Sequence, residues 1–487
     1  MAARDYNAAV TALNSLQSNF SIVDAIRKSG RGMNKDAIPE MLEFWRRLGY
    51  QPEDIDRINP IHIAGTKGKG STSAFVASIL QRTAVHSEDR TPCKVGLYTS
   101  PHLRFVRERI QINNVPLSED LFAKYFFEVW DRLSSTADGS KPVYFRYLTL
   151  MAFHTYIQEG VDAAVTECGI GGEYDSTNIL IHKTVAAVTA LGIDHVGMLG
   201  GTLPEIAWHK AGIFRRGAAA LTVPQPEPAM AVLRQRAEEQ GATLEIIPTH
   251  PAIASGEVEL GLAGDFQKSN ASLAVAIVAA HLRAVNHPSA PALDGQILPP
   301  AVREGLELVK WPGRCDLRND IDGKIAWCFD GGHTLESLEV GAQWFASVAS
   351  GRAPPILIFN QQTRDARALA RGLHSTLAKA MGSDHPFSHV IFTTNVTYKD
   401  AGYSPDLTAG NANAQDVQAL RVQKELAALW GELDPEAEVE VLGTIEEAVG
   451  RARGVAGEEE AVVLVTGSLH LVGGALEVLE GRWIAAR

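Results

Sequence analysis

The sequence predicts an α/β protein that contains a phosphate-binding loop: an N-terminal domain with a mostly parallel sheet, followed by a smaller, Rossmann-like α/β domain. Two observations predict this fold. A glycine-rich run at 62–75 lies between an apolar strand and a helix. Strand-like and helical segments then alternate along the chain, as in parallel sheets covered by helices. We place the domain boundary at Trp311, after a proline-bearing stretch, which gives domains 1–311 and 312–487.

The glycine-rich run has the features of a loop that cradles phosphate. Gly65, Gly68 and Gly70 let the backbone turn with its N–H groups exposed, and a helix follows from a Ser/Thr start. The helix N-terminus favours an anion, Lys69 adds a positive charge, and the hydroxyl of Ser71 can reach a magnesium ion. Gly70 separates Lys69 from Ser71, which departs from the common spelling of such loops. An ordinary glycine-rich turn after a strand is the alternative interpretation.

Strands and helices alternate after this run. Strand-like segments cover 94–100, 161–170 and 184–191, and helical segments cover 117–133 and 144–160. In open α/β sheets, ligands bind at the carboxyl ends of the strands. The polar residues found at those ends are therefore expected to line one cleft; they are Gly65 onward, Thr99, Ser100, Glu167, Asp194 and His195.

The second domain repeats the alternation on a smaller scale. Its strand candidates are 324–330, 355–360, 389–394 and 461–468. Residues 134–141 and 397–417 are predicted to be surface loops because they are rich in Gly, Ser, Asp and Asn.

Composition bounds the function. The 487 residues include 45 basic and 57 acidic side chains, a formal net charge of −12, which argues against a broad nucleic-acid surface. The four cysteines are scattered, which favours a reducing compartment over a zinc site. No apolar run reaches the roughly 18 residues that span a bilayer. We expect a cytoplasmic protein, with a mitochondrial form also compatible with the sequence.

Three polar residues of the first domain carry candidate chemistry. Glu167 ends a buried strand, where a carboxylate needs a cation or another partner, so it is either a magnesium ligand or a capping or salt-bridged Glu. Taken alone, His195 is interpreted as a structural histidine. Its position at a strand end beside the strands of Glu167 and the phosphate loop favours a role in the site instead. Lys210 is either a solvated helix lysine or a buried one with a lowered pKa.

The second domain offers three more candidates. Arg314 suits bidentate binding of phosphate, Asp330 suits ribose hydroxyls, and His333 at a helix start suits an anion. Each signal is modest alone, and ordinary structural roles are as compatible with these residues.

Seven segments, taken in order, closely resemble the folylpolyglutamate synthases, a family within the Mur-type ATP-dependent amide ligases. They are GTKGKGS, YTSPHL, ECGIGGEYDSTNIL, GIDHVGMLGGTLPEIAWHKAGIF, WPGR, DGGHTLES and LVTGSLHLVGG. The resemblance covers nearly the whole chain. The opening residues and the helix at 144–156 resemble eukaryotic members in particular.

The resemblance implies a role for each candidate. The residues that would bind ATP are Gly65, Thr66, Lys67, Gly68, Lys69, Gly70, Ser71, Asn270, Arg314 and Asp330. Those that would hold magnesium are Ser71, Ser100, Glu167, His195 and, as a carbamate, Lys210. Lys69, Lys210 and His333 would be catalytic, with His333 facing the transferred phosphate. Folate contacts would come from Thr99, Pro101, His102, Phe145 and Tyr147. The implied cofactors are ATP, Mg²⁺ and a monovalent cation, K⁺.

The reaction implied by the resemblance extends a folate tail. The terminal γ-carboxylate of a tetrahydrofolate (poly)glutamate attacks the γ-phosphate of ATP, and the amine of L-glutamate then attacks the acyl phosphate. The partners would be these small molecules, and the protein would be a monomer. A dihydrofolate synthase or a bifunctional enzyme is the nearest alternative. A cell-wall ligase would carry a further domain before the loop, where only 61 residues stand here. A nucleotide-binding switch or a kinase is the alternative from another class.

Overall fold

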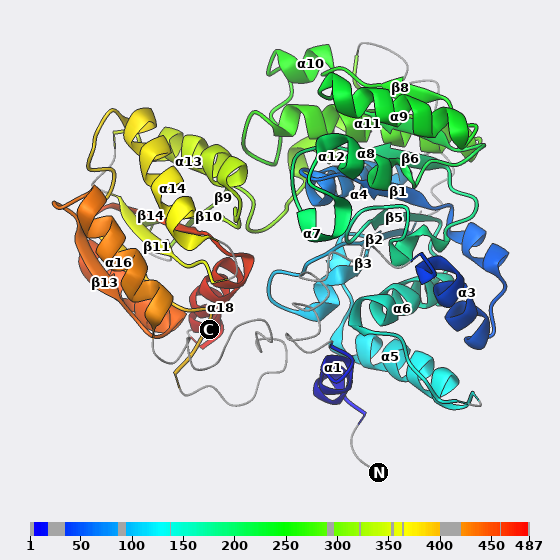
Figure 1. The fold of residues 1–487 in the computed structure, drawn as a ribbon, viewed down its shortest axis with the longest axis horizontal. Coiled ribbons are helices and arrows are strands. Elements are labelled where there is room, and N and C mark those ends of the chain that lie inside the picture. Colours follow the sequence, from blue (N-terminus) through cyan, green and yellow to red (C-terminus); the bar gives the residue numbers. More distant parts are fainter. Residues whose placement is uncertain are drawn as a thin grey trace. The chain divides into compact units, whose positions relative to one another are not determined.

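The computed structural model describes residues 4–17, 35–85, 94–136, 138–289, 297–320, 323–351, 355–362, 365–399, 420–457 and 459–485. Residues 400–417 of the loop predicted at 397–417 lie outside this set. The chain forms two compact units (Figure 1). The first unit comprises Met1–His102, Val106–Gly261 and Asp265–Lys310, and the second comprises Leu103–Phe105, Leu262–Gly264 and Trp311–Arg487.

The first unit is built on an eight-stranded sheet with the order β4-β3-β2-β5-β1-β6-β7-β8. Its strands are β1 (Ile61–Ala64), β2 (Val95–Tyr98), β3 (Ile110–Ile112), β4 (Val115–Pro116), β5 (Ala163–Glu167), β6 (Val185–Val188), β7 (Ala219–Thr222) and β8 (Leu244–Ile246). The strands from β2 to β8 in this order are parallel, and β3 and β4 extend one edge in antiparallel fashion. The α/β prediction is confirmed. The strand β1 is fully buried between β5 and β6.

The described part of the first unit also contains helices. They are α1 (Tyr6–Asn14), α3 (Ala37–Arg47), α4 (Lys69–Val85), α5 (Glu119–Ser134), α6 (Tyr144–Glu159), α7 (Val196–Leu199), α8 (Leu203–Ala211), α9 (Glu227–Glu239), α10 (Pro251–Ala254), α11 (Gln267–Ala284) and α12 (Pro300–Leu308). Three 3-10 turns, η1 (Pro52–Ile58), η2 (Val106–Arg109) and η3 (Ser176–Ile179), join them. The helix α4, which follows the glycine-rich loop, packs against α11 and α12, so its position is set by two neighbours.

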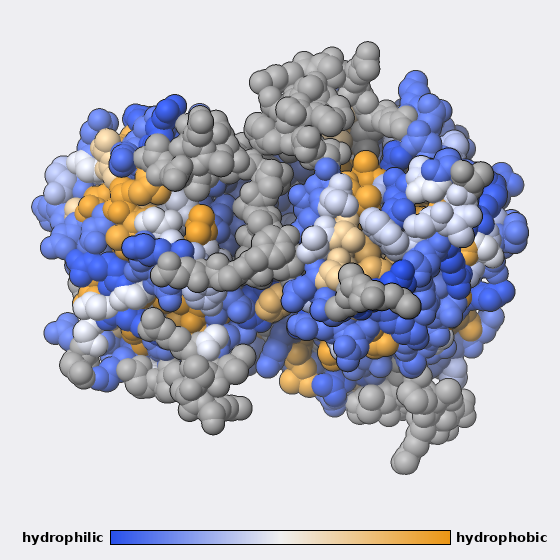
Figure 2. All heavy atoms as spheres, turned by 90° about the horizontal axis from the view of Figure 1, so that it is seen from below, coloured by the Kyte–Doolittle hydropathy of each residue, from blue (hydrophilic) through white to orange (hydrophobic). Residues whose placement is uncertain are grey.

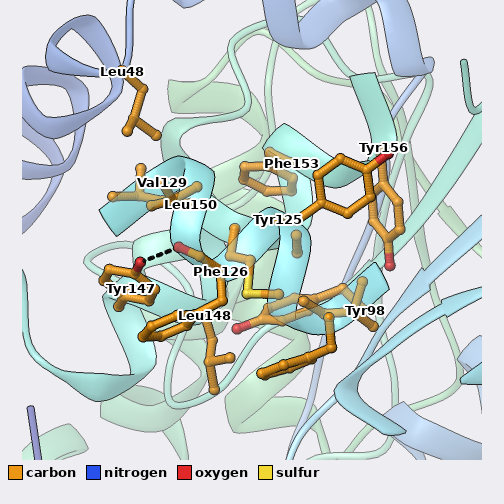
Figure 3. Close-up of a cluster of buried hydrophobic side chains, with 14 of the residues drawn as sticks. Leu48, Tyr98, Tyr125, Phe126, Val129, Tyr147, Leu148, Leu150, Phe153 and Tyr156 are labelled. Carbon is orange, nitrogen blue, oxygen red and sulfur yellow. Dashed lines mark hydrogen bonds between the residues drawn. The ribbon is translucent and has the colours of Figure 1, made fainter. Parts of the chain in front are cut away.

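A core rich in aromatic side chains lies among α1, α3, α5 and α6 (Figure 3). The rings of Phe126 and Tyr147 are 5.0 Å apart between centroids. The hydroxyl of Tyr147 donates to the backbone oxygen of Phe126 at 2.8 Å, which satisfies its one polar group in the core (Figure 3). This packing fixes the start of α6 relative to α5.

The second unit has a six-stranded sheet in the order β13-β12-β11-β14-β10-β9. Its strands are β9 (Asp316–Asn319), β10 (Ile325–Asp330), β11 (Ile356–Phe359), β12 (His389–Phe392), β13 (Glu438–Val441) and β14 (Ala461–Thr466). All pairs are parallel except β9 with β10. Its helices are α13 (Leu335–Ala349), α14 (Ala366–Met381), α16 (Arg421–Leu433), α17 (Ile445–Ala456) and α18 (Leu469–Ala485). Separate hydrophobic clusters form with α17 and α18 and with α13, α14 and α16.

The short segment Leu103–Phe105 belongs to the second unit although the surrounding sequence belongs to the first. A Cβ at Gly473 of α18 would lie 2.0 Å from the backbone oxygen of Leu103. Arg104 pairs with Glu480 at 2.5 Å, and Arg318 pairs with the other oxygen of Glu480 at 2.6 Å. The segment is therefore packed as part of that unit.

Within the described residues, no helix is long and apolar enough to cross a bilayer. On the face shown in Figure 2, hydrophilic residues predominate and hydrophobic atoms form separate patches.

Candidate active site

The glycine-rich loop between β1 and α4 requires glycine at two positions. Gly65 has φ +150°, and a Cβ there would lie 1.8 Å from Oγ1 of Thr189. Gly68 has φ +83°, in the region that favours glycine, and a Cβ there would lie 2.3 Å from Oδ1 of Asn270. The predicted ATP residue Asn270, on α11, thus covers the turn of the loop.

Hydrogen bonds from β6 hold the first half of the loop. The N–H groups of Thr66 and Lys67 both donate to the oxygen of Ala190 at 3.0 Å, and Oγ1 of Thr189 donates to the oxygen of Lys67 at 2.6 Å. The helix α4 begins at Lys69. Because the first N–H groups of a helix have no intrahelical acceptor, the amides at 69–71 form the part of the loop that suits a phosphate.

Three predicted residues meet at the ends of neighbouring strands. Nζ of Lys69 lies 3.9 Å from Oε1 of Glu167, the last residue of β5. The N–H of Ser100, which follows β2, donates to Oε2 of Glu167 at 3.0 Å. The side chain of Glu167 is buried. A buried carboxylate beside a cation and a phosphate-binding helix start is the arrangement that the strand order predicts.

Oxygen donors available here fit magnesium, a hard cation. Glu167 supplies a carboxylate, and Ser71 on the first turn of α4 supplies a hydroxyl that accepts from Nε2 of Gln267 at 3.3 Å. Among the residues that the structure describes, no three His, Cys, Asp or Glu side chains gather into a metal site. Since magnesium commonly keeps waters and takes ligands from phosphate, one carboxylate and a hydroxyl suffice for this ion.

Lys210 is buried at the end of α8, a helix that begins with a capping box between Thr202 and Glu205. Its Nζ donates to the backbone oxygen of Gly65 at 2.8 Å, so its amine lies at the first residue of the loop. Burial, with a contribution from the charge of Lys69, lowers the pKa of Lys210 to about 7. Of the two sequence interpretations, the buried lysine is confirmed.

His195 lies after β6 with a left-handed backbone, φ +52°, at the N-cap of α7. Its N–H donates to Oδ1 of Asp194 at 2.8 Å, and its side chain is exposed. A non-glycine residue with this conformation is uncommon and occurs at functional sites.

The predicted folate residues divide into two groups. Thr99, Pro101 and His102 lie on the loop after β2, and Nδ1 of His102 accepts from Nε of Arg109 at 2.9 Å. Phe145, on α6, packs against the glycine-rich turn after β5, where a Cβ at Gly169 would be 2.5 Å from its ring. The ring of Phe145 lies 6.1 Å from that of Tyr98, the last residue of β2, so the start of α6 lies beside the strand end from which this loop leaves.

The structure does not bring Tyr147 to this group. Its side chain is fully buried in the aromatic core and its hydroxyl is bonded to Phe126. Residues two apart on a helix point about 200° apart, so Phe145 and Tyr147 occupy different sides of α6.

In the second unit, Arg314, Asp330 and His333 gather at the carboxyl end of β10. Asp330 is buried and accepts from the N–H groups of Cys315 at 3.1 Å and Gly332 at 2.9 Å. Burial raises its pKa. Nη1 of Arg314 donates to the oxygen of Gly313 at 3.2 Å, and Nδ1 of His333 lies 3.1 Å from the oxygen of Gly331.

Comparison with known proteins identifies the family. No protein-family model matches the chain. The chain is 45% identical to the folylpolyglutamate synthase of Neurospora crassa over 496 residues, covering 98% of this chain and 92% of the relative. It is 45% identical to the probable folylpolyglutamate synthase of Schizosaccharomyces pombe over 491 residues, covering 98% and 94%. The chain belongs to the folylpolyglutamate synthase family.

Solved folylpolyglutamate synthases share the fold. The enzyme of Mycobacterium tuberculosis, complexed with ADP and AMPPCP, aligns with a TM-score of 0.69 and 26% identity, covering 92% of this chain and 96% of that one. The enzyme of Thermotoga maritima aligns with a TM-score of 0.66 at 24% identity, covering 95% and 96%. The predicted P-loop sheet and C-terminal α/β domain agree with these structures.

Two residues of this folylpolyglutamate synthase loop were not predicted. Thr189 follows β6 and bonds to the loop, and Gln267, three residues before Asn270 on α11, donates to Ser71 and accepts from Asn270 at 2.8 Å. The i, i+3 spacing of Gln267 and Asn270 was the available signal, since it places both on one helix face.

Proposed function

We propose that this protein adds L-glutamate to the γ-carboxylate of tetrahydrofolate (poly)glutamates and forms ADP and phosphate. The observation that carries the proposal is the approach of Lys69 to Glu167 at the first turn of α4, with the buried amine of Lys210 at Gly65. A cation, a carboxylate and a helix N-terminus together suit a nucleotide phosphate and its metal. The relative from Mycobacterium tuberculosis is complexed with ADP and AMPPCP.

We assign Mg²⁺ to Ser71, Ser100, Glu167 and His195, and K⁺ as a further cofactor. Bound magnesium supplies charge neutralisation on the phosphates and on the transferred group. Lys69 screens the charge that develops on the γ-phosphate while the carboxylate of the acceptor attacks it. For the second unit, the family resemblance supports assigning nucleotide binding to Arg314 and Asp330 and a role toward the transferred phosphate to His333.

Lys210 takes a different role in the proposal. At neutral pH a pKa of about 7 leaves a large fraction of its amine uncharged. An uncharged amine adds to CO₂ and releases a proton, which forms a carbamate anion. The carbamate then offers oxygen donors beside Gly65 for a second magnesium ion.

The acyl phosphate is the intermediate because a carboxylate has no good leaving group until it is phosphorylated. The amine of L-glutamate attacks the acyl carbon, phosphate leaves, and the amide forms. Water competes for this intermediate, so the site must exclude it during the second step.

We propose that the protein is a monomer in the cytoplasm and that a mitochondrial form also exists.

A single assay tests the proposal. Purified protein is incubated with ATP, Mg²⁺, L-glutamate and either tetrahydrofolate or dihydropteroate, and ADP release and product mass are measured. Successive glutamyl additions support the chain-extending ligase. Addition of one glutamate to dihydropteroate moves the protein to the dihydrofolate synthase reaction, and activity with both acceptors makes it bifunctional. Nucleotide binding without any ligation contradicts all three.

A further inference from the structure

Arg109 lies beside the loop that carries three of the predicted folate residues. It ends η2 and leads into β3. The N–H of Thr99 donates to its backbone oxygen at 3.1 Å, and its Nε donates to Nδ1 of His102 at 2.9 Å. Its guanidinium carbon lies 5.6 Å from the centre of the Tyr144 ring. Backbone and side chain are therefore both held against this loop and the start of α6.

The charge of Arg109 is not neutralised within the described part of the chain. Its side chain contacts His102 and Tyr144, and no described carboxylate lies within 4.0 Å of its guanidinium. Nearby arginines differ, because Arg146 pairs with Glu40 and Arg104 pairs with Glu480. Since the hydrogen bond to His102 uses Nε, the two Nη groups keep the fork that binds a carboxylate in bidentate fashion.

One aromatic ring contacts this cation, and two more continue from it. Tyr144 lies under the guanidinium, and Phe145 follows it, 6.1 Å from the Tyr98 ring and in contact with Gly169. Burial raises the pKa of Tyr98, and the charge of Arg109 acts in the opposite direction, so the charge reaches this ring. A cation beside aromatic side chains suits a ligand that has both an aromatic part and a carboxylate.

A folate acceptor has such a structure, with an aromatic ring system followed by a glutamyl residue. That residue has two carboxylates, of which only the γ-carboxylate reacts. We propose that Arg109 binds the α-carboxylate of the acceptor's glutamyl residue through its two Nη groups. The γ-carboxylate is then the one left for phosphorylation. This inference rests on the proposed function, because it assigns a ligand group in the acceptor site of that reaction.

Two acceptors that differ in one group test the assignment. Tetrahydrofolate has both carboxylates, whereas the analogue with 4-aminobutyrate in place of glutamate keeps only the reacting one. Equilibrium Kd values for both are measured by fluorescence titration, and kcat/KM by glutamate-dependent ADP release. The proteins compared are the wild type, Arg109→Gln, Arg109→Lys and the control Arg146→Gln, which removes a cation already paired with Glu40.

The wild type should prefer tetrahydrofolate to the analogue by about 10- to 100-fold, the worth of a charge-assisted bidentate contact. Arg109→Gln should lose this preference because its Kd for tetrahydrofolate rises, while its Kd for the analogue changes by less than about threefold. Arg109→Lys should recover part of the preference because charge remains without the fork. Arg146→Gln should behave as the wild type.

Equal weakening of both acceptors by Arg109→Gln would overturn the assignment, since a merely structural arginine predicts that result. An unchanged preference in Arg109→Gln, or none in the wild type, would also overturn it. If the wild type adds glutamate but its preference for tetrahydrofolate does not depend on Arg109, this inference is overturned and the proposed function stands. If the preference depends on Arg109 but no glutamate is added, the proposed function is overturned and this inference stands. Failure to bind either acceptor overturns both.

Discussion

The side-chain nitrogen of Lys183 lies 2.9 Å from Nδ1 of His62, a buried histidine three residues before Gly65. Nε2 of His62 lies 2.8 Å from Oγ1 of Thr177, and that hydroxyl donates to Oδ1 of Asp175 at 2.5 Å. Lys183 also donates to Asn178 at 3.1 Å and to the oxygen of Ile213 at 2.9 Å. A buried polar network thus links β1, which carries the phosphate loop, to the turn after β5.

Lys183→Met should lower the free energy of unfolding by about 3 kcal/mol, because three buried acceptors lose their donor. The wild type and variant are compared by urea unfolding with a common m-value. Lys379→Met on α14 is the control, because Lys379 is exposed and its change should stay within about 0.5 kcal/mol. Equal small effects for both variants would contradict a stabilising network.

Lys69→Met and Glu167→Gln should each lower kcat by at least about 10²-fold, since each removes a charge placed to stabilise the transition state. Turnover is followed as glutamate-dependent ADP release. Thermal unfolding serves as the control for folding, and we expect Tm to fall by only a few degrees, about the effect of 1 kcal/mol. Normal kcat in Lys69→Met would mean that the loop does not bind the reacting phosphate.

Gly68→Ala should raise the KM for ATP and destabilise the protein, because its Cβ would lie 2.3 Å from Asn270. Gly49→Ala is a matched control: Gly49 has φ +89°, close to the +83° of Gly68, but its Cβ would meet nothing within 4 Å. Both variants carry a backbone cost of about 1 kcal/mol. The additional loss of stability in Gly68→Ala relative to Gly49→Ala measures the steric clash with Asn270. Identical stability and KM in the two variants would contradict the close approach of Asn270.

The pH dependence of stability should reveal the buried amine of Lys210. Its pKa is about 7 in the folded protein against 10.5 for the ordinary group, so between these values the unfolded chain binds more protons. Stability relative to Lys210→Met should therefore rise by about 2 kcal/mol from pH 7 to pH 9. Below pH 7 the difference levels off, since both states are protonated. Urea unfolding in CO₂-free buffer measures it, and a flat difference would indicate an unperturbed lysine.

Tyr147→Phe should leave the KM for tetrahydrofolate unchanged and lower stability by about 1 kcal/mol, the usual worth of one buried hydrogen bond. Phe145→Ala should raise that KM by about tenfold through lost aromatic contact. Steady-state kinetics with varied tetrahydrofolate separate the two. If Tyr147→Phe raised KM as much as Phe145→Ala, Tyr147 would contact the acceptor after all.

The strands that carry the site were predictable because each is a short, fully buried apolar run ended by polar residues. The strands β1, β5 and β6 have this form, and their order in the sheet brings Gly65, Glu167 and Thr189 to the same edge. Edge strands such as β8, β9 and β13 were missed, since partial exposure weakens their apolar pattern.

Side-chain partners could not be read from the sequence. Thr189 and Gln267 act through packing of β6 and α11 against the loop. The spacing of Gln267 and Asn270 places both on one face of a helix, but it does not specify that this face meets the loop. The family resemblance predicted Phe145 and Tyr147 together as folate contacts, but helix geometry turns one toward Gly169 and the other into the core. That no carboxylate among the described residues lies within 4.0 Å of the Arg109 guanidinium likewise follows only from the placement of the neighbouring acids.

The assignment of Leu103–Phe105 to the second unit bears on attempts to divide the protein. A fragment cut at Trp311 would contain all six strands of the second sheet but not this segment. Gly473 would lose its backbone neighbour, and Glu480 would keep only Arg318 of its two arginines. The second unit is thus not encoded by one continuous stretch of sequence. Expressing it as an autonomous fragment would require residues 103–105 to be supplied, for example through a redesigned chain order.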